Sequence, residues 1–142
     1  MGVQENIDTV RRLEDAYNRR DYSTLPAVIA DGIQAHTPGS DQLPQNHEGF
    51  AQNNEGSYGA FPDRRTEILD IFGEGDKVVA RIRMTGTNKG GLPWFGIPAN
   101  DAAVDIGWIQ ISRHDDAGKI VETWSQLEAP KLMQQLGAMP GM

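Results

Sequence analysis

Histidine, tyrosine and carboxylate side chains are the main candidates for chemistry, because the chain contains no cysteine and only three histidines. The lack of cysteine excludes thiolate metal sites, iron–sulfur clusters and cysteine nucleophiles. His36 lies in a short segment of extended character, where an imidazole can act near pH 7 as a base or a donor. A structural hydrogen bond is the alternative. His47 and His114 fall in a loop start and a hairpin turn, where we expect surface positions.

Tyr17 and Glu128 are the two other groups placed where they can meet a ligand. Tyr17 ends an amphipathic segment, so its hydroxyl can bond either a substrate carbonyl or the backbone of the core. Glu128 ends the last extended segment, where its carboxylate can reach a cavity mouth. The alternative for Glu128 is a solvated acid at the start of the final helix, stabilised by the helix N-terminus. The histidines are not spaced as ligands with a carboxylate pair, so we expect no metal and no cofactor.

Hydrophobic periodicity predicts the elements that must position these groups. A period of 3.6 in the first half favours helices, and a period of two after residue 65 favours strands. Ser23 is a candidate cap for a short second helix, which Asp31 and Gly32 would end. Helices are expected at residues 4–20, 23–30, 47–58 and 130–136. Extended segments are expected at residues 33–37, 66–72, 77–87, 103–113 and 119–127. Helices followed by antiparallel strands indicate an α+β fold.

Length and charge narrow the class of protein further. The chain has 142 residues and a formal net charge of −7, from 13 Lys and Arg against 20 Asp and Glu. This length favours a single domain over residues 1–142. The negative charge argues against nucleic acid and anionic membranes as partners. The chain shows neither an obvious signal peptide nor a long apolar run, so we expect a cytoplasmic protein.

Four short segments, in the same order, carry a resemblance to a known family. They are Ala16 to Asn18, Gly49 to Ala51, Gly96 to Pro98, and the closing stretch from Gly118 to Gly137. In these segments the chain resembles the SnoaL-like polyketide cyclases, or ester cyclases, of the nuclear transport factor 2-like superfamily. The resemblance implies a cone-shaped fold, with N-terminal helices packed in a curved antiparallel sheet. It also implies a cofactor-free aldol cyclisation of a polyketide ester in an internal pocket.

The same resemblance places serine and glutamine where the family has its acid–base pair. The family uses an aspartate on the last strand and a histidine on the strand before, and the matching residues here are Ser125 and Gln110. Neither side chain can remove a proton from carbon. If both point inward, strand alternation turns Trp108 and Thr123 inward as well. Asn53 matches another pocket position of the family, and its alternative is a simple exposed helix residue.

Two classes of function remain open from the sequence. The first is a cofactor-independent cyclase or isomerase-type enzyme acting on an apolar carbonyl or polycyclic compound, with His36, Tyr17 and Glu128 as the rearranged catalytic groups. The second is a non-catalytic small-molecule-binding module, or an accessory protein for oxygenation, on the same fold. Trp124, Ile109 and Ile111 alternate away from the pocket and would form a large apolar patch. We therefore expect a homodimer or higher homo-oligomer formed through the sheet.

Overall fold

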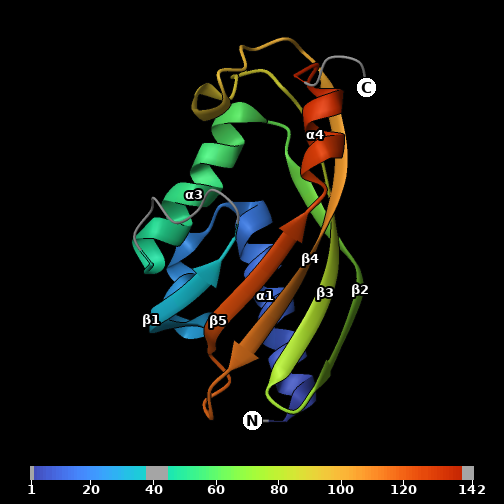
Figure 1. The fold of residues 1–142 in the computed structure, drawn as a ribbon. Coiled ribbons are helices and arrows are strands. Elements are labelled where there is room, and N and C mark those ends of the chain that lie inside the picture. Colours follow the sequence, from blue (N-terminus) through green and yellow to red (C-terminus); the bar gives the residue numbers. More distant parts are fainter. Residues whose placement is uncertain (1, 38–44, 139–142) are drawn as a thin grey trace.

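The computed structural model describes residues 2–37 and 45–138. Its elements, in chain order, are α1 (Val3–Arg19), η1 (Tyr22–Thr24), α2 (Leu25–Val28), β1 (Ile29–His36), α3 (His47–Ala60), β2 (Arg65–Glu74), β3 (Lys77–Thr87), η2 (Pro93–Phe95), β4 (Ala103–His114), β5 (Ile120–Leu127) and α4 (Ala129–Gln135). The predicted α+β class is confirmed. In Figure 1 the strands curve in front of α1, while α3 and α4 lie toward the other end of the molecule.

Within the described residues the strands form one five-stranded sheet in the order β1-β5-β4-β3-β2. The pairs β2–β3, β3–β4 and β4–β5 are antiparallel, but β1 runs parallel to β5. The expectation of a wholly antiparallel sheet is therefore wrong at β1. Hairpins join β2 to β3 and β4 to β5, whereas β1 is reached from α2 and left through α3, so no hairpin imposes an antiparallel direction on it.

Two hydrophobic clusters hold the helices against the sheet. In the first, Val10 and Leu13 of α1 pack with Ile82 of β3 and Ile120 of β5. The second joins α4 to the other end of β3 and β4 through the buried residues Met84, Val104, Ile106, Leu132 and Leu136. Trp108 packs against both clusters. The inner face of the sheet is thus the face that the helices cover.

The start of β1 differs from its prediction. Asp31 and Gly32 do not end a helix but lie within β1, where Gly32 adopts a φ of 75° beside a register shift between Ile29 and Gln34. The residue that caps the preceding turn is Asp21, whose carboxylate accepts from the Ser23 N–H, and not Ser23 itself. An Asp-Gly pair is found both at the end of a helix and in a bulged strand with a left-handed glycine. The sequence alone therefore does not distinguish these two structures.

Two histidines expected at the surface are in fact packed. His114 is only 3% exposed, and its ring lies 2.9 Å from both Ser112 Oγ and Gly118 O. Burial lowers the pKa of His114. Alternation from Ser112 places His114 on the inner face, and the register shift beside it buries Ile120 where alternation from Thr123 would bury Val121. His47 is half-buried and bonds the carbonyl of Ile29 at 2.7 Å.

Candidate functional site

The last two long strands bring Gln110 and Ser125 directly opposite each other. They are register partners across β4 and β5, as are Ser112 with Thr123 and Trp108 with Leu127. Ser125 and Thr123 are 8% and 6% exposed, and Gln110 is half-buried. Facing side chains at such positions have Cβ atoms about 4.5–5.5 Å apart. The inner face therefore carries an amide and a hydroxyl group at Gln110 and Ser125, the two positions that match the acid–base pair of the family.

Tyr17 lies near the end of α1, on the helix that the first hydrophobic cluster joins to the sheet. Its ring packs against the first hydrophobic cluster, and burial raises the pKa of its hydroxyl. The side chain nevertheless stays half-buried, and no hydrogen-bond partner for its hydroxyl is found in residues 2–37 and 45–138. The Tyr17 hydroxyl is largely removed from water but is not completely enclosed by the protein. It is therefore available to donate a hydrogen bond to a ligand.

The amide that α3 buries is Asn54, while its neighbour Asn53 is exposed. Asn54 Nδ2 donates to the carbonyl of Tyr17 at 3.1 Å and to the Tyr22 hydroxyl at 3.0 Å. Asn54 Oδ1 accepts from Arg64 at 3.2 Å. Asn54 thus ties α3 to the end of α1 and holds the backbone of Tyr17 in place. Sequence reasoning selected Asn53 and missed Asn54, because the phase of a weakly amphipathic helix is hard to fix from its pattern.

His36 lies on the opposite face of the sheet from Gln110 and Ser125. It is the register partner of Trp124 on β5, and their rings stack with centroids 5.6 Å apart. Its Nε2 lies 2.8 Å from Glu122 Oε2, and Glu122 also accepts from Arg113. The bond to His36 is the main reason that the pKa of Glu122 is lowered. The structure therefore separates His36 from the inner-face groups.

Glu128 is engaged by the backbone of β4. Its Oε1 accepts from the Gly107 N–H at 2.7 Å, while its own N–H donates to the Gly107 carbonyl at 3.0 Å. Gln135 of α4 bonds the backbone of Asp105 with its side-chain amide alone, since its Oε1 accepts from the Asp105 N–H at 2.8 Å and its Nε2 donates to the Asp105 carbonyl at 3.0 Å. These two residues continue the ladder of β4 beyond its last pairing with β5 at Leu127. Glu128 is exposed and stands at the N-cap of α4, as the second alternative expects, and its bond to the Gly107 N–H is the feature that neither alternative includes.

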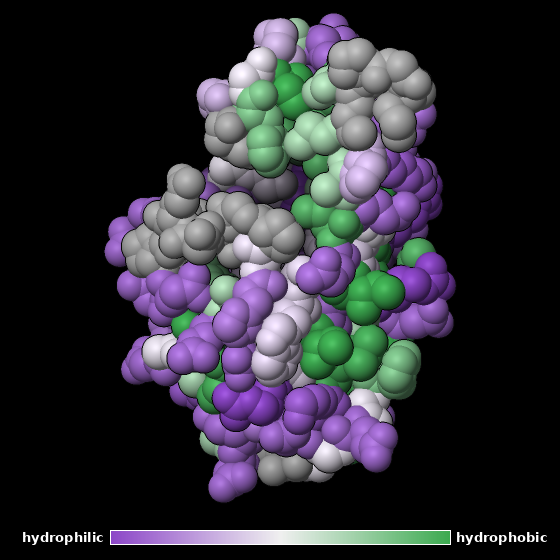
Figure 2. Space-filling model, in the orientation of Figure 1, coloured by the Kyte–Doolittle hydropathy of each residue, from purple (hydrophilic) through white to green (hydrophobic). Residues whose placement is uncertain are grey.

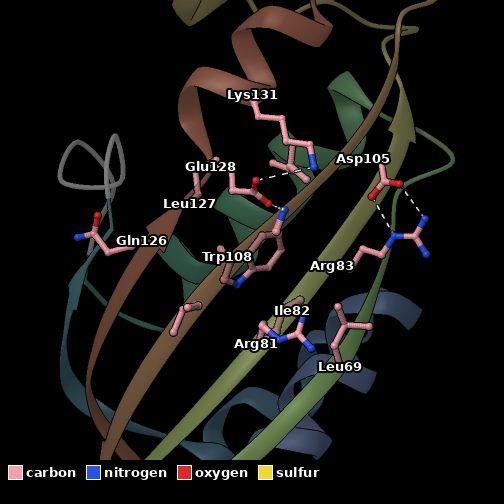
Figure 3. Close-up of a pocket in the computed structure, with 13 residues that line it drawn as sticks. Leu69, Arg81, Ile82, Arg83, Asp105, Trp108, Gln126, Leu127, Glu128 and Lys131 are labelled. Carbon is pink, nitrogen blue, oxygen red and sulfur yellow. Dashed lines mark hydrogen bonds and ion pairs between the residues drawn. The ribbon is translucent and has the colours of Figure 1, made fainter.

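A shallow hollow of about 400 Å³ surrounds Glu128. Figure 3 shows Glu128 and Lys131 above β4, with Asp105 bonded to Arg83 on the neighbouring strand. The absence of a side chain at Gly107 opens this hollow, since an added Cβ would lie 2.9 Å from Glu128 Oε1. Of the predicted site residues, Trp108 and Glu128 line it, whereas Tyr17, Gln110 and Ser125 do not. A glycine inside a long strand was the available sequence signal, and sequence reasoning did not use it.

The curved, unclosed sheet, with helices on its inner face and polar groups from β4 and β5 beneath them, defines a nuclear transport factor 2-like fold. The family model described as SnoaL-like polyketide cyclase matches residues 7–136. This chain belongs to the SnoaL-like polyketide cyclase family. A search of curated proteins found no match to it.

Solved structures give the same fold. TsrD from Streptomyces laurentii is 24% identical with a TM-score of 0.85, and the match covers 98% of this chain and 99% of that one. IdmH from Streptomyces antibioticus, described as "a putative polyketide cyclase", is 29% identical with a TM-score of 0.79, covering 93% and 98%. AclR from Streptomyces galilaeus, described as "a putative hydroxylase", is 26% identical with a TM-score of 0.81, covering 99% and 90%. No helix among the described residues is long and apolar enough to cross a membrane.

Proposed function

We propose that this protein binds an apolar or aromatic carbonyl compound of polyketide type between its helices and the inner face of its sheet. Neutral groups orient the oxygen atoms of the ligand there. The observation that carries the proposal is the pair Gln110 and Ser125, which face each other on the inner face where the family resemblance has its acid and base. Amide and hydroxyl groups donate and accept hydrogen bonds but exchange no proton with carbon near neutral pH.

Among the three groups considered for catalysis, Tyr17 is the one that we assign to the ligand. His36 is occupied by Glu122 and Trp124 on the other face of the sheet, and Glu128 is occupied by Gly107. On this proposal His36 and Glu128 stabilise the fold, while Tyr17 and Gln110 contact the ligand. Trp108 and Thr123 complete the wall beside them.

A second candidate is an accessory role in oxygenation. The similarity to AclR favours it, because the description of that protein names a hydroxylase and the match covers 99% of this chain. The same binding site serves both candidates, so the difference lies in what happens to the ligand. Oxygen uptake by an oxygenase acting on an anthraquinone polyketide ester, measured with and without this protein, separates the two, since an accessory protein raises the uptake and a protein that only binds the ester does not.

Replacing Tyr17 with phenylalanine is expected to weaken binding of an anthraquinone polyketide ester about 2- to 10-fold, the value of one hydrogen bond. The fold should survive, because the Tyr17 hydroxyl has no partner within the described residues. Isothermal titration calorimetry measures the affinity. His36→Ala is the matched control and should bind like the wild type. An equal loss of affinity in His36→Ala, with Tyr17→Phe unchanged, would contradict the assignment.

We also propose a homodimer through the outer face of the sheet. Figure 2 shows hydrophobic side chains gathered over the middle of the sheet, with hydrophilic residues around them. Phe72 and Ile109 on this face are 61% and 49% exposed. The double variant Phe72→Arg, Ile109→Arg should shift the protein from dimer to monomer in size-exclusion chromatography with light scattering. Ala27→Arg, at an exposed position of α2, is the control. A wild-type protein that is monomeric at micromolar concentration contradicts the prediction.

A further inference from the structure

Helix α3 covers the inner face of the sheet between the two hydrophobic clusters. Phe50 and Ala51 near its start pack against the first cluster, and Ala60 at its end belongs to the second. Trp108 packs against both clusters, so α3 spans the part of the inner face where Trp108 lies. In Figure 1 α3 extends from the side of β1 toward the link between β3 and β4. It therefore lies over the face to which we assign the ligand.

Helix α3 is held in place chiefly by polar bonds, unlike α1 and α4. Its sequence contains three glycines and no Leu, Ile, Val or Met. Its buried residues are two small ones and two polar ones, Gly49, Ala60, Asn54 and Tyr58. By contrast, α1 buries Val10 and Leu13, and α4 buries Leu132. Because buried apolar area is the main favourable term in packing, α3 is the helix that separates from the sheet at the lowest cost.

The link between β3 and β4, residues 88–102, lies beside the end of α3 and is held firmly. Asn88 is fully buried, and its Nδ2 donates to the Pro98 carbonyl and to Asn100 Oδ1 at 3.0 Å each. Its Oδ1 accepts from the Gly91 N–H at 2.9 Å. One buried amide thus ties both halves of the link together. The link is therefore a fixed support for α3 and not a moving part.

The polar bonds of α3 converge on the end of α1 and the turn after it. The carboxylate of Glu55 accepts two bonds from Arg20, at 2.7 and 2.5 Å, and a third from the Tyr22 hydroxyl. Asn54 donates to the Tyr22 hydroxyl and to the Tyr17 carbonyl. The side chains of Arg20 and Glu55 are 49% and 40% exposed, so water competes for their ion pair. We call Arg20, Tyr22 and Glu55 the latch of α3.

The C-terminal end of α3 is its fixed end. The Ala60 carbonyl accepts from the N–H groups of both Lys89 and Gly90 at 3.1 Å. Phe61, directly after the helix, is buried and belongs to the second cluster. At the other end, the half-buried His47 bonds the backbone of β1. A movement of α3 therefore pivots at Ala60 and Phe61 and displaces its N-terminal end most.

We propose that α3 is a gate, which swings away from the sheet about Ala60 and Phe61 when the latch opens, admits the ligand to the inner face and closes over it. The inference rests on the proposed function, which places the ligand beneath α3. An exposed ion pair breaks at little cost, whereas the bonds of Asn54 and Tyr22 return the helix to one position. Opening of α3 then limits the rate of ligand binding, as the opening of a lid does in many enzymes.

Amide hydrogen exchange without ligand tests whether α3 opens as a unit. We expect the amides of α3 in the wild type to exchange at least about 10-fold faster than those of β3, because α3 opens while the rest of the domain stays folded. Glu55→Ala should raise the exchange of α3 a further 3- to 10-fold, roughly the value of the latch bonds, and leave β3 unchanged. Glu48→Ala is the matched control, because it removes an exposed carboxyl of the same helix that bonds Gln52 within that helix.

Stopped-flow binding of an anthraquinone polyketide ester, followed by tryptophan fluorescence, tests whether this opening admits the ligand. Glu55→Ala should raise the association and dissociation rate constants together by about 3- to 10-fold and change Kd less than about 2-fold. The rates change together because the latch does not touch the ligand and closes again over it. Glu48→Ala should match the wild type. A Glu55→Ala protein in which the dissociation rate alone rises marks Glu55 as a ligand contact and overturns the gate.

The outcomes separate the gate from the proposed function. If the amides of α3 exchange as slowly as those of β3, α3 opens only with the whole domain and the gate is overturned, whether or not the ester binds. Faster exchange in Glu55→Ala with unchanged association of the ester shows another route of entry and also overturns the gate. If the ester does not bind while α3 exchanges as expected, the proposed function is overturned and the opening of α3 stands.

Discussion

The double variant Ser125→Asp, Gln110→His is expected to cyclise an aromatic polyketide ester at least about 100-fold faster than the wild type, since a positioned acid–base group contributes about 10²–10⁴-fold. The two positions are register partners across β4 and β5, so the new carboxylate and imidazole would lie within reach of each other. Product formation followed by chromatography measures the rate.

The burial of Ser125 is the physical reason for this expectation. At 8% exposure, desolvation would raise the pKa of an aspartate at this position toward the working pH, which makes it a better base. The neighbouring histidine would limit that rise when protonated and would hold the carboxylate in place. In contrast, the serine and glutamine of the natural chain keep the site neutral at every physiological pH.

Ser125→Asn, Gln110→His is the matched control, because asparagine has the shape of aspartate without its basicity. It should bind the ester like the double variant and leave the rate at the wild-type level. If the aspartate variant binds the ester but cyclises it no faster than this control, the ligand is not oriented for the family reaction. The pocket shape has then diverged together with the two side chains.

The sequence predicted the parts of the fold that strong periodicity determines. Strand β3 occupies its predicted range, 77–87, and α1 lies within one residue of its predicted range, because each buries one regular stripe of side chains. Alternation from Trp108 places Val104 and Ile106 inward and Ile109 outward, and the structure buries the first two and exposes Ile109. The parallel pairing of β1 with β5 was not predictable in this way. The direction of a strand depends on the connections that lead into and out of it, and not on the alternation of its side chains.

The candidate site was harder to predict than the fold, because its side chains depend on contacts between distant elements. Alternation and family resemblance brought Gln110 and Ser125 together, as the structure does. His36 falls on the other face because the sheet register pairs it with Trp124. The period of 3.6 over residues 4–20 places Glu14 on the outward face of the first helix, whereas the structure buries it against β2, more than 50 residues later. A carboxyl group in an amphipathic helix gives no local sign that it is buried.

Replacing Gly90 with alanine is expected to cost about 3 kcal/mol or more of stability, above the usual range for an overpacked site. Gly90 lies in the link between β3 and β4, where an added Cβ would stand 1.8 Å from the Gly59 carbonyl oxygen at the end of α3. That oxygen belongs to backbone, which cannot rotate away as a side chain would. The Gly90 N–H also donates to the carbonyl of Ala60 at 3.1 Å, so the link and the helix are held at this distance.

Gly56→Ala is the control for Gly90→Ala, because it makes the same change inside α3 with nothing within 4 Å of the new Cβ. Alanine is the better helix former there, so this variant should gain about 0.5–1 kcal/mol. Urea denaturation followed by circular dichroism measures both variants. Since the whole domain is stabilised by about 5–15 kcal/mol, the predicted loss at Gly90 is a large fraction of the total. A Gly90→Ala protein whose stability lies within about 1 kcal/mol of the wild type would contradict this prediction. It would show that the link can move away from α3 at little cost in free energy. The close approach of the two backbones would then not be what holds the link against α3.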